Sequence, residues 1–91
     1  MPSRKVTISN RLGLHARPAM LLAECAGTFT SSIGVRRMDA KDTVDGKSIM
    51  QLLMLAGTAG TVLEITAEGD DAAAALASIA ELFERGFEDD E

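Results

Sequence analysis

Apolar and polar residues alternate in three separate stretches of the chain, and this period of two predicts strands with one buried face. The stretches begin at Val6, Ile33 and Leu63. Including one shorter segment, the strands that we expect cover residues 4–10, 30–37, 42–45 and 61–68. The third strand would return beside the second after a turn over residues 38–41.

Apolar residues three and four positions apart predict two helices that each bury one face. These residues are Ala19, Leu22, Ala23 and Ala26 in the first helix, and Leu76, Ile79, Ala80 and Phe83 in the last. The first helix would cover residues 16–26 and end at Gly27, since glycine commonly ends helices. The last helix would be capped by Asp70 or Asp71 and would end at Gly86.

A short helix is expected over residues 49–55, with Ser48 as its N-cap because serine is favoured there. Only Gln51 interrupts its apolar sequence. A helix of this kind cannot bury every side on a small domain. By spacing, Leu52 and Leu55 are the better candidates for the core.

The order strand, helix, strand, strand, helix, strand, helix predicts an α+β fold. A four-stranded, mainly antiparallel sheet with three helices on one face satisfies it. The sequence has no internal repeat or linker, so residues 1–91 are expected to form one domain. The acidic tail, residues 87–91, is expected to be frayed and solvated.

The composition requires an aliphatic core, because 46% of the residues are hydrophobic but there are three Phe, no Trp and no Tyr. A formal net charge of −5 argues against nucleic acid as a partner. Cys25 has no internal disulfide partner and is expected to fill space in the first helix. No apolar run reads as a signal peptide or approaches the roughly 20 residues of a membrane span, so we expect a cytoplasmic protein without membrane insertion.

His15 is the only histidine, and it lies where a strand gives way to a helix. Gly13 allows the sharp turn before it, and Pro18 is tolerated in a first helical turn. His15 would therefore lie at or next to the N-cap, near the free N–H groups of Ala16 and Arg17. A helix N-terminus binds phosphate, and the Arg17 guanidinium suits phosphate oxygens. This pattern predicts a histidine that accepts a phosphoryl group and gives it up again, without a metal or other cofactor.

Other interpretations of His15 follow from its position alone. A lone histidine at a helix start is more often a weak cap or a surface residue than a reactive group. A metal site would need a cluster of ligands, which one His and one Cys do not provide.

The stretch Gly13-Leu14-His15-Ala16-Arg17-Pro18-Ala19 resembles the active-site signature of the HPr phosphocarrier proteins of the bacterial phosphotransferase system. A second stretch, Gly46-Lys47-Ser48-Ile49-Met50-Gln51-Leu52-Leu53, resembles the regulatory-serine segment of that family, at a matching separation. The resemblance extends from about Val6 to Phe83. It implies an open-faced sandwich in which His15 is phosphorylated from phosphoenolpyruvate through enzyme I and passes the group to an acceptor domain of the enzyme IIA type. It also implies a carrier rather than an enzyme, in either the sugar-uptake or the nitrogen-linked branch.

Two roles are open for Ser48. Its position alone predicts a helix cap and nothing more. The resemblance implies a second role, because a dedicated HPr kinase/phosphorylase phosphorylates the matching serine in many family members, chiefly Gram-positive ones. A phosphate there would place about two negative charges beside an apolar surface and weaken docking. The alternative function is therefore a regulatory binding module that acts through Ser48 and this surface.

An exposed apolar cluster marks a surface for partner proteins, and methionine suits it because it adapts to different shapes. Ile49, Met50, Leu53 and Met54 share the short helix, and Met20 would extend the cluster from the first helix. The docking surface that we expect consists of Met20, Ile49, Met50 and Leu53. We expect a monomer. Several HPr proteins carry basic residues further along the first helix, where this chain has Glu24 and Gly27.

Overall fold

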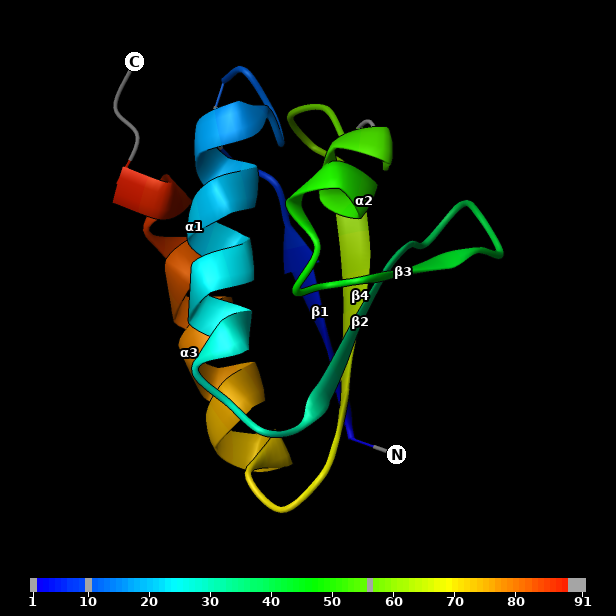
Figure 1. Ribbon diagram of the computed structural model, residues 1–91. Coiled ribbons are helices and arrows are strands. Elements are labelled where there is room, and N and C mark those ends of the chain that lie inside the picture. Colours follow the sequence, from blue (N-terminus) through cyan, green and yellow to red (C-terminus); the bar gives the residue numbers. More distant parts are fainter. Residues whose placement is uncertain (1, 10, 56, 89–91) are drawn as a thin grey trace.

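The computed structural model describes residues 2–9, 11–55 and 57–88, and it shows an open sheet with helices packed on it (Figure 1). The elements are β1 (Ser3–Thr7), α1 (Ala16–Gly27), β2 (Ser32–Arg37), β3 (Thr43–Asp45), α2 (Ile49–Met54), β4 (Val62–Glu68), α3 (Ala72–Glu84) and the 3₁₀ helix η1 (Gly86–Glu88). The predicted order of strands and helices is confirmed. Within the described ranges, no helix combines the length and apolar character needed to cross a bilayer.

The four strands form one antiparallel sheet in the order β1-β4-β2-β3. β4 lies between β1 and β2, and β3 returns along the other edge of β2. The register pairs Val6 with Leu63, and Ile65 with Val35, so buried residues of neighbouring strands lie opposite one another. The apolar side chains therefore share one face of the sheet, as the alternating pattern predicts.

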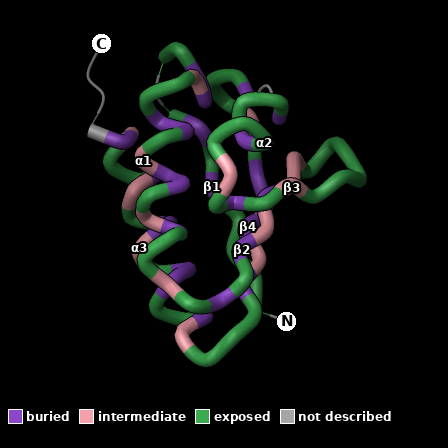
Figure 2. The backbone as a smooth tube through the Cα atoms, viewed as in Figure 1, coloured by how far each residue is buried: buried purple, intermediate pink, exposed green. Residues whose placement is uncertain are grey.

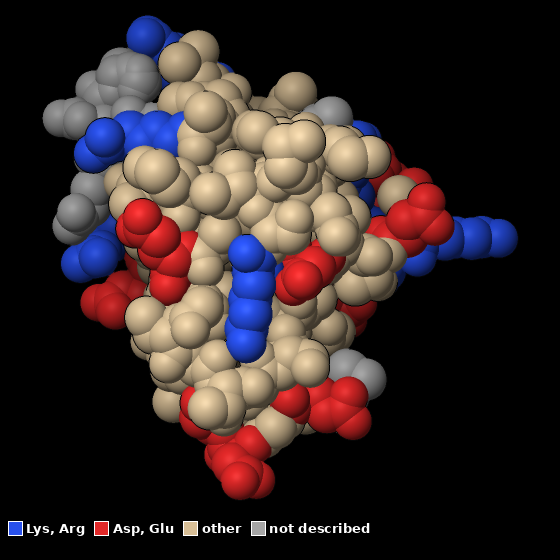
Figure 3. Space-filling model, in the orientation of Figure 1, with Lys and Arg blue, Asp and Glu red and all other residues tan. Residues whose placement is uncertain are grey.

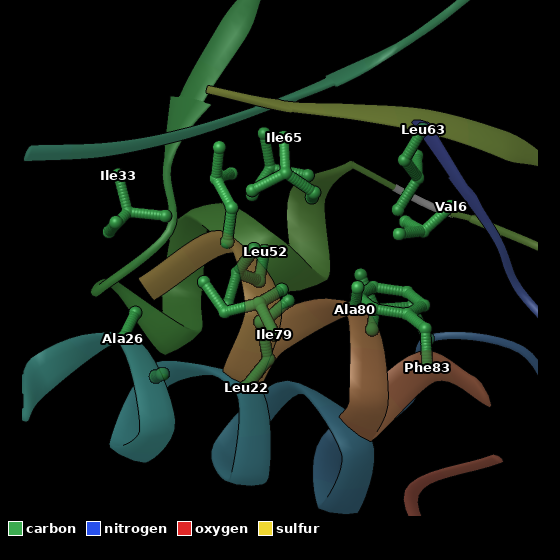
Figure 4. Packing of buried hydrophobic residues seen from close by; sticks show 14 of the residues in the cluster. Val6, Leu22, Ala26, Ile33, Leu52, Leu63, Ile65, Ile79, Ala80 and Phe83 are labelled. Atoms are coloured by element: carbon green, nitrogen blue, oxygen red, sulfur yellow. The ribbon is translucent and has the colours of Figure 1, made fainter. Parts of the chain in front are cut away.

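The core lies between this face and the three helices (Figure 2). Figure 4 shows Leu22 of α1, Leu52 of α2 and Ile79 of α3 gathered between the layers, with Ile65 on the sheet side. The residues predicted to point inward are all buried: Val6, Ile8, Ala19, Leu22, Ala23, Ala26, Ile33, Val35, Leu52, Leu55, Leu63, Ile65, Ala67, Leu76, Ile79, Ala80 and Phe83. Burial of one such aliphatic side chain stabilises the fold by about 1.5–3 kcal/mol, so this core fixes the helices against the sheet.

The structure corrects the prediction that the side chain of Asp70 or Asp71 caps the last helix. Asp71 is the N-cap residue of α3, but its side chain makes no cap hydrogen bond within that helix. The carboxylate instead accepts hydrogen bonds from the backbone N–H groups of Thr30, at 2.9 Å, and Ser31, at 3.0 Å. Because these two donors are used here, β2 begins at Ser32, two residues later than predicted.

Other boundaries shift by small amounts. β1 ends at Thr7, although Ile8 still donates its N–H to the carbonyl of Thr61 at 2.9 Å. Asn10, the last residue of the predicted strand, lies outside the described residues. α1 continues through Gly27 and is capped by Thr28, because the chain keeps a right-handed conformation there.

The prediction of a frayed tail is wrong at Phe87. Its side chain is only 1% exposed, and its ring packs edge-to-face on Phe83 with 4.8 Å between the ring centroids. The chain leaves α3 through Gly86, which has a left-handed backbone with φ of +59°, and this reversal returns Phe87 to the core. Residues 89–91, the remainder of the predicted tail, lie outside the described residues.

Candidate functional site

His15 is the N-cap residue of α1, as the sequence predicts. Its backbone is extended, with φ of −92° and ψ of −166°, and its carbonyl accepts the first helical hydrogen bond from the N–H of Ala19 at 2.9 Å. The side chain makes no cap hydrogen bond to the helix and is half-buried. The imidazole therefore does not cap the helix, and part of its surface is open to solvent.

A close backbone contact fixes the loop that precedes His15. Leu14 is buried and donates its N–H to the carbonyl of Gly57 at 2.9 Å. Gly13 has a φ of +77°, and a Cβ atom there would lie 2.5 Å from the Gly57 carbonyl oxygen and 2.9 Å from Cα of Thr58. Only glycine fits both this conformation and this space. The loop after α2 is therefore a structural support for the His15 loop.

The first turn of α1 has two backbone N–H groups without an acceptor inside the helix. Pro18 has no N–H and Ala19 donates to His15, so these groups belong to Ala16 and Arg17, as predicted. The partial positive charge of the helix N-terminus lies at the same place. The Arg17 side chain is exposed, and within the described part of the chain no carboxylate forms an ion pair with it. This end of α1 can therefore receive an anion.

Ser48 is the N-cap of α2, and this prediction is confirmed. Its Oγ accepts a hydrogen bond from the N–H of Gln51 at 3.3 Å. Lys47, the preceding residue, donates from Nζ to the carbonyl of Phe29 at 2.9 Å, which links the start of α2 to the end of α1. Figure 1 shows α2 beside the N-terminal half of α1. Ser48 and His15 therefore lie at the starts of two neighbouring helices.

The four residues of the predicted docking surface are all exposed: Met20, Ile49, Met50 and Leu53. Met54 is exposed as well, whereas Leu52 and Leu55 are buried as predicted. Figure 3 shows a broad area without charged side chains over α2 and the adjoining part of α1. An apolar surface thus extends across both helices near the His15 loop.

Two hollows of the structure lie away from the residues predicted for the site. A hollow of about 340 Å³ lies between β1 and α3, and another of about 450 Å³ is lined by residues of β2, β3 and β4. Neither is lined by a residue predicted for the site. Among the described residues, no group of three His, Cys, Asp or Glu side chains is placed to bind a metal ion.

Comparison with known proteins assigns the family. A family model described as "PTS HPr component phosphorylation site" matches residues 2–85. The chain belongs to the HPr family. It is 41% identical over 91 residues to Phosphocarrier protein HPr of Pseudomonas aeruginosa, covering 100% of each chain. It is 40% identical over 87 residues to Phosphocarrier protein NPr of Proteus mirabilis, covering 96% of each. The crystal structure of HPr-C-His from Thermoanaerobacter tengcongensis has a TM-score of 0.91 and 36% identity, with full coverage of both chains.

The protein is therefore an HPr-type phosphocarrier of the phosphotransferase system, and as such a carrier rather than an enzyme. The family, the open sheet with three helices and the carrier function are confirmed. Its relatives include proteins named HPr and proteins named NPr. The contact of Gly57 with the His15 loop is not among the features that the sequence predicted. The place of Gly57 in the sequence, just after the predicted helix over residues 49–55, gives no signal for its contact with Gly13.

Proposed function

We propose that His15 is the residue that carries the phosphoryl group. It accepts the group from phosphorylated enzyme I, which is itself charged from phosphoenolpyruvate, and passes it to an acceptor domain of the enzyme IIA type. One observation supports this most strongly. A half-buried imidazole lies at the N-cap of α1 without serving as its cap, next to the first-turn N–H groups of Ala16 and Arg17.

The proposed reaction needs no group beyond these residues. A neutral ring nitrogen of His15 attacks phosphorus, so a nitrogen–phosphorus bond forms while the donor's bond to phosphorus breaks and its electron pair stays with the donor. The phosphoryl oxygens then receive hydrogen bonds from the backbone of Ala16 and Arg17, and the guanidinium of Arg17 offsets their charge. The same contacts are available in both directions of transfer, as a carrier requires.

Partners would dock on the surface formed by Met20, Ile49, Met50 and Leu53. This surface is apolar and adjoins the end of α1 that bears His15. Donor and acceptor must both reach the same imidazole, so they would use this surface in turn. A single copy of the chain is sufficient for that exchange, and we expect it to act as a monomer in the cytoplasm.

The decisive experiment uses the His15→Ala variant with enzyme I and labelled phosphoenolpyruvate. Acid-labile label should be lost completely, because the nucleophile is gone. The melting temperature should stay close to that of the wild type, because the ring is half-buried and makes no helix cap. Ser48→Ala is the matched control and should accept label normally. Acid-labile label on the His15→Ala variant would contradict the proposal.

A second candidate function is regulation through Ser48. The observation that favours it is the position of this half-buried serine at the N-terminus of α2, directly before the exposed residues Ile49 and Met50. A phosphate on Ser48 would be held by the first N–H groups of α2 and would place negative charge next to the docking surface.

Incubation with HPr kinase/phosphorylase and ATP tests this regulation. Peptide mass spectrometry should locate the phosphate on Ser48, and the Ser48→Ala variant should stay unmodified. Ser32→Ala, which removes an exposed serine of β2, should be modified like the wild type. A wild-type protein that gains no phosphate on Ser48 would rule the regulation out.

A further inference from the structure

Two methionines of α2 are the most exposed large apolar side chains among the described residues. Met50 is 72% exposed and Met54 is 78% exposed. They are four residues apart on one helix, so they lie on the same side of α2. Met20 of α1 is exposed to 39%, and α1 packs against α2. Among the described methionines, the two most exposed therefore belong to the apolar surface next to the His15 loop.

Met38 is a less exposed methionine of the same chain, and it serves as a comparison for Met50 and Met54. Met38 follows β2 and is 38% exposed, about half as much as Met50 or Met54. Its sulfur accepts a weak hydrogen bond from Nη2 of Arg36 at 3.8 Å, and its N–H donates to the carbonyl of Val62. Met38 thus belongs to the hairpin and the sheet rather than to the α1–α2 surface.

We propose that Met50 and Met54 form a peroxide-sensitive modification site. Its oxidation controls the docking of partner proteins on the apolar surface of α1 and α2, next to the His15 loop. This proposal rests on the proposed function, in which partners dock on that surface. Oxidation converts a flexible apolar thioether into a polar sulfoxide. A docked partner would have to remove that polar oxygen from water without a prepared hydrogen-bond donor, so the complex becomes weaker.

The chemistry is a two-electron oxidation by hydrogen peroxide. A lone pair of the methionine sulfur attacks one peroxide oxygen, a sulfur–oxygen bond forms and the oxygen–oxygen bond breaks. The second oxygen takes up the proton and leaves as water, so sulfur is oxidised and peroxide is reduced. Methionine sulfoxide reductases reverse the change, which makes the modification suitable for regulation.

The test treats the carrier alone with limiting hydrogen peroxide, removes the oxidant with catalase, and then adds enzyme I and phosphoenolpyruvate. Peptide mapping should find sulfoxide on Met50 and Met54 before Met38. The KM of enzyme I for the oxidised carrier should rise about tenfold, the size expected for burying one unpaired polar group, while the maximum rate changes little. Treatment with methionine sulfoxide reductases should restore the KM.

Two variants isolate the site. Met50→Leu combined with Met54→Leu keeps volume and apolar character but removes both sulfurs, so its KM after peroxide should equal its own KM before treatment. Met38→Leu should respond to peroxide as the wild type does. An oxidised wild type with sulfoxide on both residues and an unchanged KM would overturn the proposal, and so would an equal loss in the double variant. If the untreated carrier accepts no phosphoryl group, the proposed function itself fails, and the oxidation proposal fails with it.

Discussion

In the proposed function, the phosphoryl group would be bound by two kinds of donor, the backbone N–H groups of Ala16 and Arg17 and the guanidinium of Arg17. The helix already fixes the N–H groups of Ala16 and Arg17. They would therefore lose no conformational entropy on binding a phosphoryl group. The guanidinium is exposed and carries a positive charge, and among the described residues it has no competing ion pair. In the proposed function, the backbone would define where the phosphoryl oxygens lie, and the side chain would add charge stabilisation.

If both the backbone and the guanidinium bind the phosphoryl group, Arg17→Ala should slow its transfer without abolishing it. A charged hydrogen bond contributes about 1.5–3 kcal/mol, so the rate of phosphoryl transfer from enzyme I should fall by about 10- to 100-fold without reaching zero. Arg17→Lys should give an intermediate rate, because it keeps the charge but loses the planar fork. Rapid-quench measurement of labelled carrier checks both rates. A wild-type rate in Arg17→Ala would show that the guanidinium does not bind the phosphoryl group.

The residues of the site differ in how far the sequence reveals them. His15 and Arg17 are proposed from the sequence because one short stretch contains a turn, a helix start and a helix terminus that suits an anion. The support from Gly57 is not, because it depends on a backbone approach between loops that are far apart in sequence. Local patterns point to the proposed site residues, whereas the packing that fixes them depends on tertiary structure.

Asp71 shows how one side chain joins two elements. Its carboxylate accepts hydrogen bonds from the N–H groups of Thr30 and Ser31 and from both of their hydroxyls. These bonds lower the pKa of Asp71 to about 2, with the Ser31 hydroxyl as the largest cause and the Thr30 N–H next. Ser31 is buried, so its donors would lack a partner without this carboxylate. The start of α3 is thereby tied to the loop between α1 and β2.

Asp71→Asn should lower the melting temperature by several degrees at pH 7, and the difference should depend on pH. A pKa that is lower in the folded state means that the ionised carboxylate stabilises the fold. Its contribution is complete above the unfolded pKa of about 3.9 and is lost as the pH falls toward the folded value. Thermal melts should therefore show the two proteins converging between about pH 4 and pH 2.

Asp70→Asn is the matched control for this experiment, since it removes the neighbouring exposed carboxylate. Its melting temperature should follow the wild type across the whole pH range. Equal behaviour of the two variants would show that the carboxylate of Asp71 has no special role. Local preference predicts Asp70 or Asp71 as the cap, but the sequence gives no sign that the Asp71 side chain accepts hydrogen bonds from a loop 40 residues earlier.

Phe87 closes the molecule at its C-terminal end. It has a left-handed backbone, with φ of +60°, which costs a non-glycine residue about 1–2 kcal/mol. Burial of the ring contributes about 1.5–3 kcal/mol, and the edge-to-face pair with Phe83 adds about 0.5–1.5 kcal/mol. The free energy gained by burying the ring exceeds the cost of the left-handed backbone, so the chain reverses and returns Phe87 to the core. The sequence contains a signal for this, because Phe87 continues the apolar face of α3 four residues after Phe83, but the acidic residues beyond it favoured a tail.

Phe87→Ala should lower the free energy of unfolding by about 3 kcal/mol, because it removes a buried ring and leaves a cavity. Phe87→Leu should cost about 1 kcal/mol, since most of the volume remains. Urea denaturation followed by circular dichroism measures both. Well below its melting temperature, Phe87→Ala should still accept the phosphoryl group at the wild-type rate, because Gly13 and Gly57 fix the His15 loop independently. A stability equal to that of the wild type would mean that the C-terminal turn does not close the core, and a slowed transfer in the folded variant would show that this turn also positions the His15 loop.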